Sequence, residues 1–241
     1  MISWASITNK GERSHNEDSI GQAEKNGKYC FVLADGLGGH GKGEVASKLA
    51  VDTVLRDFDA QYEKYTFLES TFAHVQQVLL EEQEKNNCKD AMKTTLVCMV
   101  LDGDEIRWAH CGDSRLYFFS KKKMKLRTLD HSVPQMLVLS NQLKEKDIRF
   151  HEDRNRLLRV MGMDTDKKLV TVGKTLNAAY RQQFLLCSDG FWEYVTEKEM
   201  EKLMKKSNSV QDWINRLTDT VVANGTGNGM DNYSAISIWI D

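Results

Sequence analysis

Three short apolar runs follow one another closely in the middle of the chain, at residues 94–101, 105–111 and 115–119. Consecutive runs of this kind pair as a meander, which favours an antiparallel sheet over a repeating strand–helix–strand pattern. Other strand-like runs occur at 2–8, 28–34, 168–173, 183–188 and 233–240. Helical periodicity covers 43–58 and 66–84, and further helices are expected near 134–149, 191–204 and 209–223. The order of these segments predicts a mixed α/β domain with strands dominating its middle.

The composition narrows the class of protein further. The chain has 241 residues and a single proline, Pro134, so no proline-rich linker divides it, and we expect one domain over residues 1–241. Its 33 basic and 35 acidic side chains give a net charge of -2, which excludes the basic surface of a dedicated nucleic-acid binder. No uncharged apolar stretch is long enough to cross a membrane, and the N-terminus lacks the apolar stretch of a signal peptide. These features predict a cytoplasmic protein with no nucleic-acid or membrane partner.

The cysteines indicate the same compartment. They are odd in number, widely spaced and mostly embedded in apolar runs: Cys30, Cys88, Cys98, Cys111 and Cys187. This distribution is typical of reduced thiols in a protein core. Because the sequence has no CxxC pair and no Cys/His cluster, a zinc site is not expected.

Aspartates beside glycines end three of the apolar runs. These pairs are Asp35-Gly36, Gly112-Asp113 and Asp189-Gly190. Asp231 stands directly before the last strand, and Glu17 and Asp18 precede another short strand-like run. Carboxylates at strand ends can converge on one rim of a sheet, and a neighbouring glycine lets backbone carbonyls approach the same point. A single Asp-Gly is most often a plain turn, but the recurrence of acids at strand ends indicates a shared site.

A cluster of acids needs cations, because several carboxylates cannot stay ionised side by side without them. Hard oxygen ligands without His or Cys favour Mg²⁺ or Mn²⁺ over zinc. The sequence offers no competing nucleophile: it has no GxSxG elbow, no SxxK and no cysteine with a clear histidine partner. A carboxylate-rich site of this kind points to water activated by bound metal, for which a phosphate ester is the natural substrate.

The glycine-rich loop at residues 36–43 resembles two nucleotide-binding patterns and satisfies neither. Gly43 follows Lys42, at the position where a Walker A loop needs Ser or Thr to hold Mg²⁺. A dinucleotide fold needs an acid at the end of a second strand about twenty residues on, whereas Asp57 and Asp59 come at the end of a predicted helix. Nucleotide binding is therefore not expected.

Five motifs combine these features along the chain. They are Arg13-Ser-His-Asn-Glu17-Asp18, Ala34-Asp35-Gly36-Leu37-Gly38-Gly39-His40, Gly112-Asp113-Ser114-Arg115, Ser188-Asp189-Gly190 and Asp231-Asn232. In this order and spacing they resemble the metal-dependent, type 2C protein serine/threonine phosphatases in their bacterial form. Residues 94–97 and 130–132 resemble weaker motifs of the same family, so the match spans nearly the whole chain. The resemblance implies an α/β (α+β) fold of two packed antiparallel sheets flanked by helices on both outer faces, a four-layer sandwich.

The resemblance also implies a role for each acid. Asp35 would bridge two tightly bound Mn²⁺ or Mg²⁺ ions, with the carbonyl of Gly36 on one of them. Asp189 and Asp231 would complete the ion on their side, while Glu17 and Asp18 would surround the other, partly through water. Asp113 would join Asp189 at a third, weaker metal site. The metal ligands so implied are Glu17, Asp18, Asp35, Gly36, Asp113, Asp189 and Asp231.

Two further parts of the site follow from the same resemblance. Arg13 would hold the substrate phosphate through its bidentate guanidinium, so Arg13, Asp35 and Asp189 are the expected catalytic residues. The segment near 134–154 would form a flap beside the site. Leu37 stands where animal members carry a histidine proposed as general acid, and His40 is expected to be a loop residue. Lys93 stands where the family has a glycine before Thr-Thr; neither departure touches the acids, so activity is expected to survive.

The predicted function is therefore metal-dependent hydrolysis of phosphoserine and phosphothreonine in proteins. The partners would be phosphorylated protein substrates, the opposing enzyme a Ser/Thr kinase, and the protein itself a monomer. Two alternatives stay open: a hydrolase of small phosphoesters, and a non-catalytic phosphatase-like binding module that has lost its metals. The complete set of acids favours an enzyme over the binding module.

Overall fold

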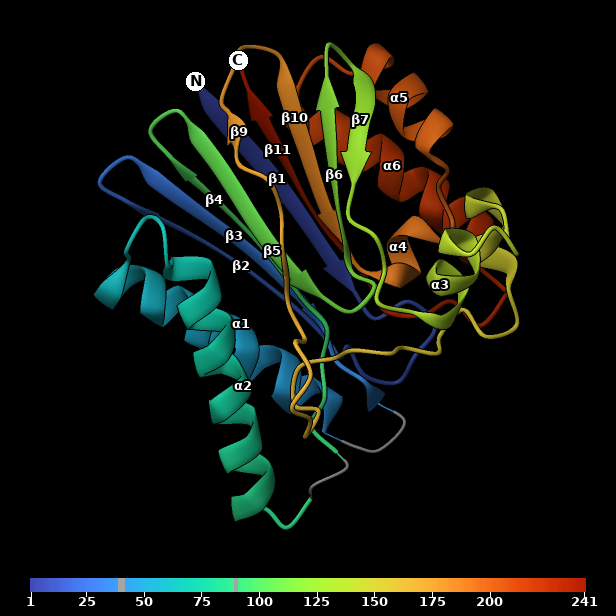
Figure 1. Cartoon of the computed structure of the whole chain (residues 1–241). Helices are drawn as coiled ribbons and strands as arrows, with labels where there is room; N and C mark the ends of the chain where they lie inside the picture. The colour runs from blue at the N-terminus through green and yellow to red at the C-terminus, as the bar shows by residue number, and fades with distance from the viewer. Residues whose placement is uncertain (39–41, 89–90) are drawn as a thin grey trace.

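Two antiparallel sheets form the centre of the molecule (Figure 1). The computed structural model describes residues 1–38, 42–88 and 91–241. Its strands are β1 (Ile2–Asn9), β2 (Asp18–Lys25), β3 (Lys28–Asp35), β4 (Leu96–Asp102), β5 (Glu105–Cys111), β6 (Arg115–Ser120), β7 (Lys123–Arg127), β8 (Thr171–Val172), β9 (Leu176–Asn177), β10 (Gln182–Cys187) and β11 (Tyr233–Ile240). One sheet has the order β1-β11-β10-β6-β7 and the other β2-β3-β4-β5-β8, with β9 pairing β5 off this path.

Helices cover the outer face of each sheet (Figure 1). α1 (Gly43–Gln61) and α2 (Phe67–Lys85) pack on the sheet that contains β3. α4 (Asp189–Trp192), α5 (Glu197–Lys206) and α6 (Val210–Gly225) pack on the sheet that contains β11. α3 (Val133–Leu139) and the 3-10 helix η2 (Glu145–Phe150) lie beside the sheet that contains β11. The predicted sandwich of two sheets between two layers of helices is confirmed.

The central strands are continuously apolar because both of their faces are buried. In β3, Phe31 and Leu33 belong to the core between the sheets, whereas Cys30 and Val32 pack against the helices α1 and α2. Successive side chains of a strand point to opposite faces, so one run of sequence supplies two core layers. All five cysteines are free thiols, and all of them except Cys88 are buried.

The structure corrects the limits of several predicted elements. The helix expected near 134–149 is wrong as a single element, because α3 ends at Leu139 and η2 starts only at Glu145. Asn141 adopts a left-handed φ of 60°, a conformation that ends helices. The helix expected near 191–204 is divided into α4 and α5, since Thr196 starts α5 with a capping box to Glu199. The run at 168–173 contains only the short β8.

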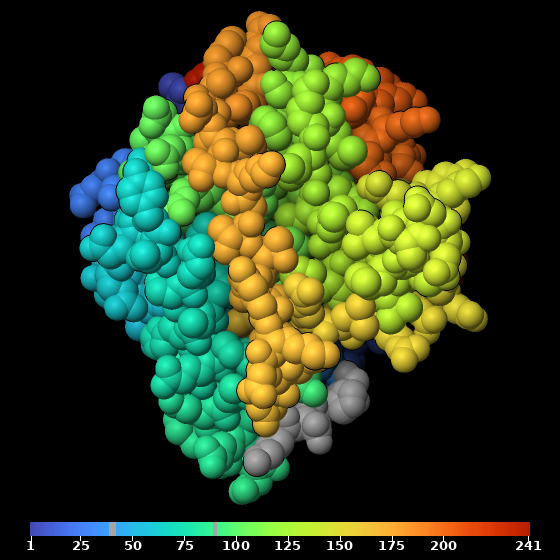
Figure 2. Space-filling model, in the orientation of Figure 1, coloured from blue at the N-terminus to red at the C-terminus, as the bar shows by residue number. Residues whose placement is uncertain are grey.

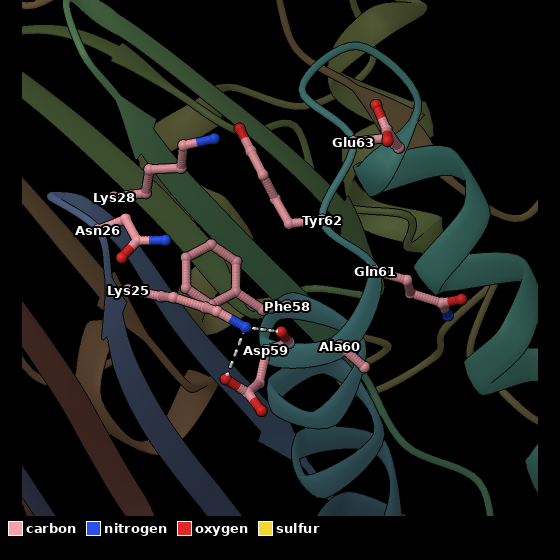
Figure 3. Close-up of a pocket in the computed structure, with 9 residues that line it drawn as sticks. All are labelled: Lys25, Asn26, Lys28, Phe58, Asp59, Ala60, Gln61, Tyr62 and Glu63. Atoms are coloured by element: carbon pink, nitrogen blue, oxygen red, sulfur yellow. Dashed lines mark hydrogen bonds and ion pairs between the residues drawn. The ribbon is translucent and has the colours of Figure 1, made fainter.

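The hairpin between β2 and β3 closes the end of the sheet that lies away from the acids. Its turn contains Asn26 and Gly27, both with positive φ, and Lys25 pairs with Lys28 in the strand register. Figure 3 shows Lys25 beside Asp59 at the end of α1, with Nζ 3.1 Å from Oδ1. Lys28 lies 4.6 Å from the ring centroid of Tyr62. The small hollow here, about 260 Å³, is therefore a junction between hairpin and helix whose lysines are already paired.

Within the described part of the chain, none of the helices has both the length and the apolar character that a membrane span requires.

Candidate metal centre

The predicted acids meet at one end of the two sheets. Asp18 starts β2 and Asp35 ends β3, and the two are direct partners in the antiparallel register. Asp189 follows β10 at the start of α4, Asp113 lies between β5 and β6, and Asp231 precedes β11. Because the chain enters or leaves a strand at each of these positions, residues far apart in sequence share one rim. The rim opens into a cleft of about 700 Å³ lined by Arg13, Glu17, Asp35, Gly36, Asp113, Asp189 and Asp231, among others.

Burial and mutual repulsion dominate the electrostatics of this cleft. Burial, followed by the charges of Asp18 and Asp189, raises the pKa of Asp35 well above its ordinary value. Burial raises the pKa of Asp18 to about 7. The pKa of Asp113 is raised by burial and then by Asp189, and that of Asp189 by burial and then by Asp231. Without a compensating positive charge, these carboxylates cannot all be ionised at neutral pH.

Two threonines fix the position of Asp35. The backbone N–H of Asp35 donates to Thr95 Oγ1 at 3.0 Å, and the hydroxyl of Thr94 donates to the Asp35 carbonyl at 2.8 Å. Thr95 N also donates to that carbonyl at 2.8 Å, and Thr95 Oγ1 lies 2.7 Å from Ser114 Oγ. The end of β3 is thereby held on both sides. These contacts explain the weaker Thr-Thr motif, which positions an acid and does not itself line the cleft.

Glycine is required where the loop after β3 passes the acids. A Cβ on Gly36 would lie 2.2 Å from the carbonyl oxygen of Gly43, and one on Gly38 would lie 1.8 Å from Glu17 Oε2. No side chain fits at Gly36, because it would meet the backbone of Gly43, whereas at Gly38 the flexible Glu17 side chain would have to move. Gly39, His40 and Gly41 lie outside the described residues, so the prediction for His40 stays a prediction.

Two polar residues of the motifs, to which no role was assigned from the sequence, hold the acids in place. Ser188 donates its hydroxyl to Asp18 Oδ2 at 2.8 Å. Asn232 accepts from the backbone N–H of Glu17 at 2.7 Å and donates to the carbonyls of Lys10 and His15. Both residues stand directly beside a predicted acid, and this adjacency was the one signal available in the sequence.

Arg13 lies at the edge of the cleft next to Asp231. Its Nη2 is 2.9 Å from Asp231 Oδ2, and the two side chains are 56% and 40% exposed. Glu17 lies close by, and its pKa is raised by burial and then by the charge of Glu44. A cationic group therefore stands at the open side of a cluster of carboxylates, where it can contact an anion that enters the cleft.

The donor set fits hard divalent cations. All of the candidate ligands present oxygen, and the buried Asp18 Oδ1 has no hydrogen-bond partner among the described residues. Among the described residues, no three His, Cys, Asp or Glu side chains are grouped closely enough to hold a metal ion by themselves. The acids instead surround a cleft roomy enough for water, which suits Mg²⁺ and similar ions because they retain several water ligands.

The segment predicted as a flap is held to the neighbouring elements by ion pairs. Arg127 Nε contacts Glu145 at 2.6 Å, Arg149 Nη2 contacts Glu197 at 3.0 Å, and Arg154 Nε contacts Glu193 at 3.0 Å. Just after it, Asn155 and Leu157 line the cleft itself.

Carboxylates gathered at one rim of a two-sheet sandwich, with an exposed arginine at the mouth of their cleft, are suited to hydrolysis assisted by divalent cations. Residues 8–225 match the model of the protein phosphatase 2C family. The chain belongs to the protein phosphatase 2C family, which confirms the resemblance found in its motifs.

Individual relatives agree with this assignment. The chain is 32% identical over 214 residues to the serine/threonine phosphatase stp of Listeria innocua, covering 85% of this chain and 84% of the relative. The crystal structure of the serine/threonine phosphatase Stp1 from Staphylococcus aureus superimposes with a TM-score of 0.90 at 29% identity, covering 100% of this chain and 96% of that one. The catalytic domain of the phosphatase PstP, solved in complex with two manganese ions, has the same fold, with a TM-score of 0.85 at 24% identity and coverage of 100% and 99%.

Proposed function

We propose that this chain is a protein serine/threonine phosphatase that removes phosphate from phosphoserine and phosphothreonine with the help of Mn²⁺ or Mg²⁺. The observation that carries the proposal is the group of Asp18, Asp35, Asp113 and Asp189, of which Asp18 and Asp113 are buried and Asp35 and Asp189 partly buried. Burial, and then their mutual repulsion, raises the pKa values of these four acids. Burying unpaired acids is costly, and bound cations offset that cost. The family membership and the named phosphatases among the relatives support the same activity.

The proposed ligand set keeps the roles implied by the motifs. Asp35 and the carbonyl of Gly36 would hold a pair of ions, with Asp189 and Asp231 on one side and Glu17 and Asp18 on the other. Asp113 would join Asp189 at a third, weaker site. Such ions lower the pKa of bound water and stabilise the charge that develops on a phosphoryl group. The structural relative solved with two manganese ions supports this number for the tight pair.

Arg13 is the proposed phosphate-binding residue. Its guanidinium lies at the mouth of the cleft and contacts Asp231 at 2.9 Å. A phosphate dianion offers two oxygens to the guanidinium fork, so Arg13 would orient the phosphate with its ester bond facing the acids. Asp231, which accepts from Arg13, would limit the rotation of that fork.

The remaining predictions stand as proposals about the whole protein. Residues 1–241 would form one catalytic domain, with the flap near 134–154 beside the cleft and contacting the protein substrate. The protein would act as a cytoplasmic monomer in signal transduction, opposing a Ser/Thr kinase. The presence of all the predicted acids in the chain, five of which line the cleft, favours this enzyme over a metal-free binding module.

Phosphate release from a phosphoserine peptide tests the proposal. The protein is stripped with EDTA, passed into chelator-free buffer and assayed with Mn²⁺, with Mg²⁺ and with Zn²⁺. We expect no release without metal and release with Mn²⁺ or Mg²⁺. Release from p-nitrophenyl phosphate alone, with no release from phosphopeptides, would favour the small-phosphoester alternative.

A further inference from the structure

A second hollow lies next to the cleft and is lined by different residues. It measures about 550 Å³ and lies between segment 171–174, orange in Figure 2, and segment 126–139, yellow-green in Figure 2. We name it the side groove. Its apolar lining includes Trp108 on β5, Leu126 on β7, Leu129, Met136, Leu139 and Leu158.

Four of these apolar side chains are about half exposed. Leu129 is 47% exposed, Met136 54%, Leu139 58% and Leu158 45%. A single exposed leucine needs no explanation, but several that line one hollow form a contiguous apolar surface. Such surfaces mark places where another molecule binds. The volume of the side groove is also within the usual range of binding pockets.

The charges around the side groove are positive. Arg159 and Lys174 line it and are exposed, and neither has an ion-pair partner within residues 1–38, 42–88 and 91–241. The acid in its lining, Asp130, is buried and neutralised by a bidentate pair with Arg115 at 2.8 and 2.6 Å. The groove therefore complements an occupant that carries carboxylates beside apolar side chains.

The side groove and the metal-binding cleft share a wall. Leu157 lines the cleft, and the next residue, Leu158, lines the groove. His131 lines the groove, and its Nδ1 accepts from the backbone N–H of Gly112 at 3.2 Å. Asp113, which follows Gly112 in the sequence, lines the cleft. A polypeptide held at the cleft can therefore continue into the groove without crossing the molecule.

We propose that the side groove docks an acidic, apolar segment of the phosphorylated protein substrate, at a distance along the chain from the phosphoserine. This inference rests on the proposed phosphatase function, and it names how that site selects protein substrates. Docking the segment makes binding of the phosphoserine intramolecular, which raises its effective concentration at the cleft. The groove thereby lowers KM for substrates that carry the segment and leaves the chemical step unchanged.

The first experiment measures binding by fluorescence anisotropy. The probes are a fluorescein-labelled peptide of leucines and glutamates, and the same peptide with lysine in place of glutamate. Leu139→Glu places a like charge in the groove, and Val222→Glu is the matched control on α6, where Val222 is 37% exposed. We expect the acidic peptide to bind the parent and Val222→Glu equally and Leu139→Glu at least about tenfold more weakly. Equal binding to Leu139→Glu, or equal binding of the lysine peptide, would overturn the proposal.

The second experiment measures turnover of one phosphoserine peptide with and without the acidic segment, joined by Gly/Ser linkers of several lengths. We expect the best linked form to have a KM about tenfold or more below that of the unlinked form, with the same kcat. Leu139→Glu should remove this difference in KM, whereas Val222→Glu should keep it. Normal turnover with equal KM for both peptides would overturn the docking proposal but not the phosphatase function. No turnover of any substrate would contradict the phosphatase function, and the anisotropy experiment would then still test docking.

A second copy of this chain is the competing occupant. Sedimentation of the parent and of Leu139→Glu over a range of concentrations decides between the two. Dimerisation of the parent that Leu139→Glu abolishes would assign the groove to a second copy and overturn the proposal.

Discussion

Trp192 links the core beside the β11-containing sheet to the cleft, so Trp192→Phe tests how precisely Asp113 must be positioned for activity. The indole Nε1–H donates to the carbonyl of Asp113 at 3.0 Å, and the Arg115 guanidinium carbon lies 3.4 Å from the centroid of the Trp192 ring. Phenylalanine retains an aromatic face for Arg115 but lacks the donor. A buried carbonyl left unpaired costs about 1–3 kcal/mol of folding free energy.

Trp192→Phe also removes the hydrogen bond that holds the backbone carbonyl of Asp113, whose side chain lines the cleft. Because a displacement of about 1 Å in a catalytic site can cost about 100-fold in rate, we expect kcat of Trp192→Phe to fall by about 10- to 100-fold. The assay is steady-state hydrolysis of p-nitrophenyl phosphate at saturating Mn²⁺, with thermal melting measured on the same samples.

Trp213→Phe provides the matched control. Trp213 on α6 is fully buried in the same core layer, and its Nε1–H donates to the carbonyl of Met200 at 3.2 Å, away from the cleft. We expect Trp213→Phe to lower the melting temperature while its kcat stays within about twofold of the parent. If Trp192→Phe also melts lower yet retains the parental kcat, then Trp192 supports only the core and the positioning argument is refuted.

Three further predictions concern individual side chains. Asp113→Ala should lower turnover strongly while calorimetry still finds two tightly bound Mn²⁺ ions; loss of all metal binding would make Asp113 a ligand of the tight pair. Arg13→Ala should raise KM for phosphopeptides by about 10- to 100-fold, because it removes charge-assisted hydrogen bonds, and Arg13→Lys should restore this only in part; an unchanged KM would exclude Arg13 as the phosphate-binding residue. Burial lowers the pKa of His131 to about 3, whereas a histidine in the unfolded chain has a pKa near 6.5. Between about pH 3 and pH 6.5 the unfolded chain therefore binds more protons than the folded protein. The metal-free protein should therefore lose about 1–2 kcal/mol of stability through His131 as the pH falls from about 7 to 5, and His131→Gln should flatten this slope in thermal melts; an unchanged slope would contradict the burial argument.

Much of the cleft was predictable because its acids carry a local signal. Asp35, Asp113 and Asp189 each stand beside a glycine at the end of an apolar run, and such a pattern can be recognised without knowing the fold. The residues that support them carry no comparable signal. Ser188 contacts Asp18 across 170 positions of sequence, and Asn232 contacts Glu17 across 215. Contacts of this range follow from the pairing of strands, which single-residue patterns do not specify.

The secondary structure divides in the same way. The central strands were predictable because both faces are buried and the runs are continuously apolar, as in β3. The region from Val133 to Phe150 was not, because its apolar residues follow a helical period through a point where the backbone of Asn141 turns left-handed. A left-handed residue other than glycine depends on surrounding contacts, so composition alone does not reveal where the helix stops.

The side groove was not predictable from the sequence either. Leu129, Met136, Leu139 and Leu158 look like core residues in a linear pattern, yet each is about half exposed. The exposure of a side chain depends on which segments pack over it in the folded protein.

Joint titration of metal and activity tests the central claim most directly. Mn²⁺ is added stepwise to metal-stripped parent protein and to Asp35→Asn, while calorimetry measures bound ions and a phosphoserine peptide assay measures phosphate release. For the parent, we expect activity to be absent at the start and to rise as a tight pair of ions binds. For Asp35→Asn, tight binding and phosphate release should be lost together, because that carboxylate is the proposed bridge. Phosphate release by the parent at its full rate in excess EDTA, or by Asp35→Asn without bound metal, would contradict the account.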